Sequence, residues 1–218
     1  MSMKKLNFKS LALLSMVFIS IIAMGQTQQK RRPFCGFSLK NGYYYEEKAQ
    51  EYITREAKPG DKSGIPDVVE EIKTQIGIDV PIYVYIAKDE ENCFATIGAG
   101  GKRILIADHL FLNKVNKGSG TEWAAISIIA HEIGHHIAGF SRRPTQLESE
   151  LDADYWSGYA LQKLGASKDA SVKCIMRFGT EHNTSSHPDK YSRAKTIRQG
   201  WDDASNGGYE HDRCESCN

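Results

Sequence analysis

The chain lacks several features that assign a protein to a special class. Beyond residue 25 it has no apolar run of the roughly 20 residues that a membrane-spanning helix requires. It has no internal repeat and no low-complexity segment. An excess of charge is also missing: three of the 28 basic residues and none of the 27 acidic ones lie in the first 25 positions, so the rest is near neutral. Nothing here indicates a nucleic-acid partner or stable insertion in a membrane after the N-terminal segment is removed.

The N-terminus has the pattern of a secretory signal peptide. Three lysines precede the uncharged stretch Leu11–Met24. Ala23 and Gly25 supply small residues at the −3 and −1 positions of a cleavage site. We therefore expect a signal peptide over residues 1–25 and an exported protein, periplasmic or extracellular. The alternative, an uncleaved anchor, is disfavoured because the apolar stretch is too short to span a bilayer.

The rest of the chain is long enough for one domain with a substantial core. We expect a flexible lead-in over residues 26–42, a domain over 43–201 and a C-terminal tail over 202–218. The tail carries Cys214 and Cys217 in a Cys-x-x-Cys spacing. Oligomeric state and any propeptide role of the lead-in stay open.

Five cysteines in an exported protein predict disulfides rather than a redox pair or a metal knuckle. An odd number leaves at least one thiol free, so we expect one or two disulfide bonds. Cys93 is the predicted free thiol, because it lies within a strand that we assign to the cleft. The connectivity of the others stays open.

Periodicity and turn residues predict an α+β fold, mainly helical, with a small and mostly antiparallel sheet. Two capping-box patterns, Ser119 with Glu122 and Thr145 with Glu148, are typical of helix N-termini. The predicted strands are 82–87, 92–97 and 103–107, the last two forming a hairpin around Gly98–Gly101. The predicted helices are 43–57, 66–77, 108–115, 123–140, 145–164, 167–178 and 188–200, with a loop at 116–120.

His131-Glu132-Ile133-Gly134-His135 organises the chain. On a helix, residues four apart share a face, so both imidazoles can reach one cation. Glu132 is then placed to accept a proton from water that the ion activates. The pattern indicates a zinc metallopeptidase with one Zn²⁺ per chain. The plain alternative is a buried helix whose histidines satisfy local hydrogen bonds.

A third ligand is expected from the acidic helix after Pro144. At about 100° per residue, Glu150 and Asp154 border the apolar arc of that helix, whereas Glu148 and Asp152 point toward solvent. We assign Glu150 as the third metal ligand. Asp154 is assigned as the acceptor that orients a histidine ligand, because metal-bound histidines normally donate their free N–H to such a group.

These motifs resemble those of the gluzincin metallopeptidases of family 48, which include CAAX prenyl proteases and HtpX-type proteases. The likeness rests on the His131–His135 motif, on Glu150-Leu-Asp-Ala-Asp154, on Asn92-Cys-Phe-Ala-Thr96, and on His187-Pro188 with Arg193. It covers about residues 80–200. The chain departs from the family's integral-membrane members, which carry several hydrophobic spans.

The resemblance implies a zincin-type metallopeptidase domain. It implies that Glu150 binds zinc, that Asp154 supports a histidine, and that His187 stabilises the oxyanion. It further implies that the 92–97 strand lines the cleft, with Asn92, Phe94 and Ala95 facing substrate. We expect this strand to be an exposed edge that pairs with the backbone of a peptide or protein substrate.

The predicted activity is hydrolysis of peptide bonds, with Glu132 as general base. Two alternatives stay open. One is a non-catalytic binding or chaperone-like module that keeps zinc as a structural element, which an intact Glu132 argues against. The other is a zinc amidase acting on cell-wall peptides, which uses the same metal chemistry. His136, His109, His182 and His211 are not expected to bind the ion.

Overall fold

The computed structural model describes residues 35–38, 53–89, 91–138, 145–207; of 35–38 it describes the backbone only. All of these lie in one compact unit, Pro33–Asn218. The predicted signal peptide, the Cys214/Cys217 pair and His211 lie outside the described residues. Within them, no helix combines the length and apolar character needed to cross a membrane.

A five-stranded sheet forms one side of the unit, in the order β1-β4-β5-β3-β2. Its strands are β1 (Cys35–Ser38), β2 (Ile53–Ala57), β3 (Ile82–Ala87), β4 (Asn92–Ile97) and β5 (Arg103–Asp108). The pair β3–β5 is parallel, and the other three neighbouring pairs are antiparallel. The predicted hairpin is confirmed as β4 and β5, joined through a short 3-10 turn at Ala99–Gly101.

The predicted helix over residues 43–57 is wrong at its C-terminal end. Ile53–Ala57 is strand β2, which pairs antiparallel with β3, and the Thr54 hydroxyl donates to the Ile86 carbonyl at 2.9 Å. Residues 43–52 lie outside the described part. The local pattern of this segment fits either structure, and pairing with a strand about 30 residues later decided between them.

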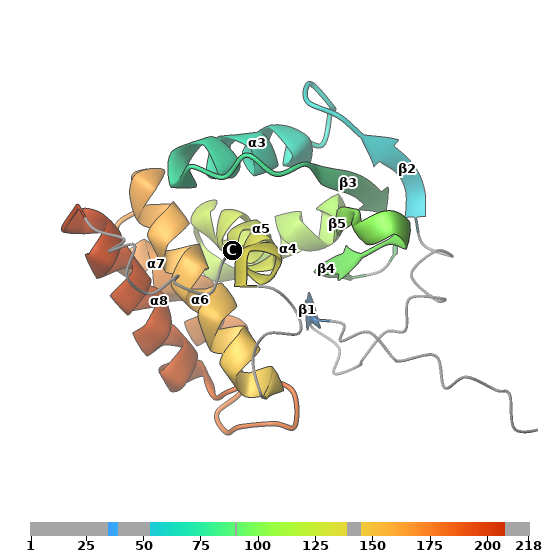
Figure 1. Ribbon diagram of the computed structural model, residues 1–218. Coiled ribbons are helices and arrows are strands. Elements are labelled where there is room, and N and C mark those ends of the chain that lie inside the picture. The colour runs from blue at the N-terminus through green and yellow to red at the C-terminus, as the bar shows by residue number, and fades with distance from the viewer. Residues whose placement is uncertain (1–34, 39–52, 90, 139–144, 208–218) are drawn as a thin grey trace, which may run out of the picture. The chain divides into compact units, whose positions relative to one another are not determined.

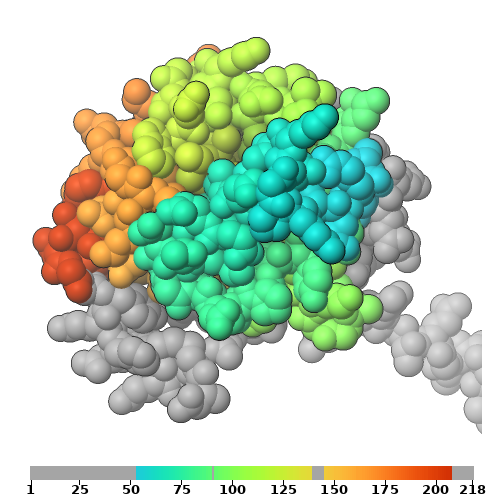
Figure 2. All heavy atoms as spheres, turned by 90° about the horizontal axis from the view of Figure 1, so that it is seen from above, coloured from blue at the N-terminus to red at the C-terminus, as the bar shows by residue number. Residues whose placement is uncertain are grey.

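Six helices are described: α3 (Ile65–Ile76), α4 (His109–Ser119), α5 (Trp123–Ala138), α6 (Gln146–Lys163), α7 (Lys168–Phe178) and α8 (Lys190–Ser205). Figure 1 shows α6, α7 and α8 together on the side away from the sheet, with α5 between them and the strands. Helix α3 packs on β3, α5 and α6. In Figure 2 the side chains of α3 and the β2 segment form one continuous surface. The α+β, mainly helical prediction is confirmed.

Helix α5 is central because it is apolar almost all round. Twelve of its residues are buried, from Ala124 to His136, and its aliphatic side chains join the main core with strands β3, β4 and β5. Such a helix belongs inside a domain rather than at its surface. The polar residues of the His131–His135 motif therefore lie in the interior.

Helix boundaries agree with the predictions in most places and differ at the C-terminal ends of α4 and α8. Helix α4 runs to Ser119 rather than to residue 115, and α8 runs to Ser205 rather than to residue 200, so it continues into the predicted tail. The Thr145–Glu148 capping box is present at α6. The Ser119–Glu122 box is wrong: α4 continues through the predicted loop to Ser119, whose hydroxyl makes no hydrogen bond. The Asn116 side chain instead accepts from the Ala125 amide at 2.7 Å. The first turn of α5 is therefore capped by a side chain of the preceding helix, which the sequence pattern did not reveal.

Glycines let three helices approach closely. A Cβ on Gly134 would lie 2.8 Å from the Ala153 Cα, so α5 and α6 meet backbone to backbone inside the zinc motif. A Cβ on Gly158 would lie 1.9 Å from the Ile197 carbonyl oxygen, which brings α8 equally close to α6. These contacts place the acidic residues of α6 between the histidines of α5 and the basic residues of α8.

Candidate metal centre

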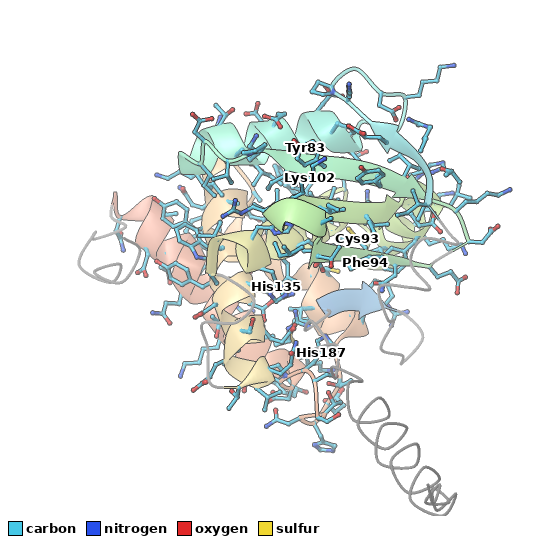
Figure 3. All side chains as sticks on the ribbon, turned by 45° about the vertical axis from the view of Figure 1, so that its right-hand side comes forward. Tyr83, Cys93, Phe94, Lys102, His135 and His187 are labelled. Carbon is cyan, nitrogen blue, oxygen red and sulfur yellow. The ribbon has the colours of Figure 1, made fainter. Side chains whose placement is uncertain are left out.

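His131 and His135 lie on one face of α5, as their spacing predicts. Both side chains are buried, and their Nε2 atoms are 3.2 Å apart. In Figure 3, His135 lies between the β4 residues Cys93 and Phe94 and the loop residue His187. Two ring nitrogens this close, with solvent excluded, converge on a common point.

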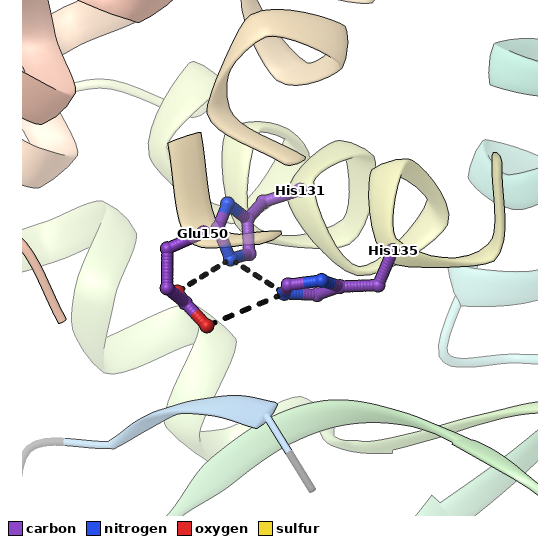
Figure 4. Close-up of side chains that lie close together, drawn as sticks. All are labelled: His131, His135 and Glu150. Carbon is purple, nitrogen blue, oxygen red and sulfur yellow. Dashed lines mark hydrogen bonds and ion pairs between the residues drawn. The ribbon is translucent and has the colours of Figure 1, made fainter. Parts of the chain in front are cut away.

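Glu150 on α6 completes the group. Its Oε2 lies 3.4 Å from His131 Nε2, and its Oε1 lies 3.7 Å from His135 Nε2. One ligand atom from each of the three residues lies within 4.8 Å of the others, and all three residues are buried (Figure 4). The structure therefore brings together the three residues that the sequence assigned as metal ligands.

Asp154 supports His131 from behind. Its Oδ1 accepts a hydrogen bond from His131 Nδ1 at 2.9 Å, which leaves Nε2 directed at Glu150 and His135. The residue one helical turn from Glu150 thus lies where the sequence placed it, against a histidine. A carboxylate in this position fixes the tautomer and the aim of a metal-binding imidazole.

Arg193 on α8 holds the Asp154 carboxylate in turn. Its Nε donates to Oδ2 at 2.7 Å and its Nη2 to Oδ1 at 2.9 Å, a bidentate pair with both residues buried. The sequence marked Arg193 only as part of a motif and gave it no role. Its contact could not be read from the chain, because it joins residues 39 positions apart.

Glu132 faces β4 rather than solvent. It is fully buried, and its Oε2 accepts a hydrogen bond from the Ala95 amide at 2.8 Å. The other oxygen, Oε1, is buried without a hydrogen-bond partner. Burial raises the pKa of this carboxyl to about 8, with the positive charge of His131 opposing and the negative charge of Glu150 adding to the rise.

Charges around the three residues favour a carboxylate beside basic nitrogens. Burial by itself would raise the pKa of Glu150, but the hydrogen bond from His131 and the charge of that ring hold it well below its usual value. Burial likewise would lower the pKa of His131, but the charge and hydrogen bond of Asp154 raise it to about 9. Burial lowers the pKa of His135 to about 3, so that ring stays neutral.

A bound zinc ion fits these positions. Tetrahedral ligands at about 2.0–2.1 Å from zinc lie about 3.3–3.5 Å from each other, and the three ligand pairs here are 3.2, 3.4 and 3.7 Å apart. Two imidazoles and a carboxylate are a ligand set that catalytic zinc uses.

His187 reaches the group from the loop before α8. Its Nε2 lies 3.5 Å from Glu150 Oε2, and the side chain is 29% exposed. Its Nδ1 lies 2.8 Å from the Ser186 hydroxyl. Among His131, His135 and His187, it is therefore the ring that solvent reaches most easily.

Strand β4 lies against the site, but the prediction that it is an exposed edge is wrong. It pairs with β5 on one side and with β1 on the other. Ala95 contacts the site through its amide, whereas Phe94 packs in a separate cluster with Ala87 and Ile106. The Asn92 side chain is buried and accepts from the Cys93 amide at 2.8 Å. The sequence missed β1 because its partner strand is more than 50 residues away.

The histidines that were set aside lie elsewhere. His136 Nε2 donates to the Ile104 carbonyl at 3.1 Å, and His109 and His182 are exposed. Cys93 is a free buried thiol, as predicted, and Cys174 is another. With two of five thiols free, a second disulfide is ruled out, so at most one bond remains for the side chains outside the described residues.

Comparison with known proteins adds no family: no protein-family model, curated protein or solved structure matches the chain.

Proposed function

We propose that this protein is a zinc-dependent peptidase with His131, His135 and Glu150 as the metal ligands. The observation that carries the proposal is the buried, unpartnered Oε1 of Glu132 beside the three ligands. An unpaired buried polar atom costs about 1–3 kcal/mol. A structural metal site has no use for it, whereas a hydrolytic site needs such an acceptor.

A zinc ion in this site supplies Lewis acidity, which polarises the scissile carbonyl and makes water a better nucleophile. The protein's own residues do the rest. Glu132 Oε1 accepts the proton from the attacking water and delivers it to the leaving amine. The Ala95 amide holds the other oxygen of the same carboxylate, which fixes its direction.

We assign His187 the oxyanion role. The support is that its side chain is partly exposed and that its Nε2 lies 3.5 Å from Glu150 Oε2, so it would lie near the carbonyl of a substrate bound at this site. Burial lowers the pKa of this ring, which favours a neutral imidazole that donates one hydrogen bond. Ser186 on Nδ1 selects which nitrogen carries the proton.

The substrate is a peptide in extended conformation. Strand β4 lies beside the site, but its two edges are paired with β1 and β5. A peptide that took the place of β1 would pair with the main chain of β4, a mode of binding that needs little sequence preference. From the predicted signal peptide we infer that this activity lies outside the cytoplasm. The expected substrates are therefore proteins of that compartment or the peptides of the cell wall.

The test is a digest of casein and of a peptide library by the zinc-loaded protein, with and without a chelator. Cleavage that the chelator abolishes and zinc restores is the expected result. The matched control is Glu132→Gln, which keeps the ligands and removes the base. If the zinc-loaded protein cleaves neither substrate, both as wild type and after strand β1 is displaced from β4, the non-catalytic binding module is the better account.

A further inference from the structure

Strand β1 fills the position at which a substrate strand would pair. It runs antiparallel to β4 in the register Cys35↔Ala95, Gly36↔Phe94, Phe37↔Cys93 and Ser38↔Asn92. Since β5 occupies the opposite edge of β4, β1 takes the edge that a peptide could use. Main-chain pairing of this kind does not distinguish a segment of the same chain from a substrate.

The same strand passes the proposed base. Ala95, whose amide donates to Glu132 Oε2, is the register partner of Cys35. The strand also contacts α5, the helix that carries both histidines, and Figure 4 shows it on the side of the three ligands where the sheet lies. A peptide strand on β4 and β1 therefore compete for one place next to the site.

The pairing is suited to being reversible. A four-residue edge strand forms few ladder hydrogen bonds, and each contributes only about 0.5–1.5 kcal/mol net. Its tether nevertheless supplies an effective concentration in the millimolar range. Such a segment keeps weakly binding peptides off β4, and yet its own release from β4 requires little free energy.

We propose that β1 is a self-inhibitory strand, which occupies the substrate-binding edge of β4 and must leave it before a peptide can bind. The inference rests on the proposed peptidase function and adds its regulation. Activation then means displacement of residues 35–38 from β4, by cleavage of the segment or by a partner that binds it.

The test substitutes proline in β1 of the full mature chain. Consecutive amides of a strand point to opposite sides, so Gly36→Pro with Phe37→Pro removes one donor toward β4 whichever phase applies. The control carries Gln28→Pro and Gln29→Pro, upstream of β1. Zinc content and melting temperature establish that each protein is folded and loaded.

Two readouts follow. Hydrogen exchange of β4 amides should speed up in the β1 variant and not in the control. Peptide hydrolysis should rise by about tenfold or more in kcat/KM, since the millimolar tethered competitor is gone. A synthetic peptide matching residues 34–39 should then inhibit the variant.

Equal hydrolysis by wild type and variant, with β4 exchange faster in the variant, would overturn the inhibition and leave the peptidase intact. Unchanged exchange in a folded variant would overturn the pairing. If all zinc-loaded forms are inactive, the proposed function fails, and the inhibition fails with it.

Discussion

Arg193 holds the Asp154 carboxylate with two hydrogen bonds, at 2.7 and 2.9 Å, while Asp154 holds His131 at 2.9 Å. The three residues come from α8, α6 and α5 and are all buried. Burial would raise the pKa of Asp154, but the guanidinium beside it lowers that pKa, so the carboxylate stays charged in the interior. One ion pair therefore joins three helices and fixes the direction of a candidate metal ligand.

Removing the guanidinium should damage stability and metal binding together. Arg193→Met leaves a buried carboxylate without its cation, which typically costs about 3–5 kcal/mol. Loss of the support behind His131 should weaken zinc binding by about 10–100-fold. Denaturant unfolding and zinc titration measure the two effects.

A double variant separates charge from packing in this ion pair. Arg193→Met with Asp154→Asn should be less destabilised than Arg193→Met alone, because no unpaired charge is left. Lys195→Met, on an exposed turn of the same helix, is the control and should change little. Strict additivity of the two substitutions would contradict the role given to Arg193.

Metal stoichiometry tests the ligands directly. The protein should bind about one zinc per chain, as measured by elemental analysis after loading and dialysis. His135→Ala should lose the metal, since it removes one of three converging atoms. His136→Ala should keep it, since that ring bonds to the Ile104 carbonyl instead. A zinc content near zero in the loaded wild type would refute the site.

Catalysis and metal binding should separate at Glu132. Glu132→Gln keeps the shape of the side chain but cannot take a proton, so peptide hydrolysis should fall by about 10²–10⁴-fold. Zinc content should stay at the wild-type level. Glu150→Gln, in contrast, should lose zinc as well as activity. Full activity of Glu132→Gln would show that another group is the base.

The metal-free protein should become less stable as pH rises. Burial raises the pKa of Glu132 to about 8 from its ordinary value of 4.5. Between these values the folded state binds a proton at Glu132 that the unfolded state has lost. The contribution of Glu132 to the free energy of unfolding therefore falls with rising pH and levels off above pH 8. Glu132→Gln removes this effect.

Thermal melts at pH 5 and pH 8 measure it. The melting temperature of metal-free Glu132→Gln should exceed that of wild type by more at pH 8 than at pH 5. Glu122→Gln, at an exposed carboxyl, should show no such change. If the difference in melting temperature between Glu132→Gln and wild type became smaller as pH rises, the direction assigned to the Glu132 pKa shift would be wrong.

Close helix packing at Gly134 should be needed for the site. Gly134→Ala places a Cβ 2.8 Å from the Ala153 backbone, and relief requires α6, with Glu150, to move. We expect a loss of about 1–3 kcal/mol and weaker zinc binding. In Gly118→Ala the new Cβ meets only the ring end of Phe178, which can rotate away. Equal effects of the two substitutions would argue against this packing.

The sequence by itself determined the elements whose signals are local. The four-residue spacing of His131 and His135 needs only a helix to bring both rings to one face. The helical phase that turned Glu150 and Asp154 inward follows from their distance to the apolar residues of the same helix. Glu150 and Asp154 are indeed buried, and Glu148 is exposed.

Tertiary structure decided what depends on segments far apart in the chain. Strand β2 replaced a predicted helix because β3 offered it a partner, and β1 covered the edge of β4 that the sequence left open. Arg193 gained its place only when α8 packed on α6. Forming such contacts costs loop-closure entropy, which strand pairing and burial between distant segments offset. No local sequence pattern contains that information.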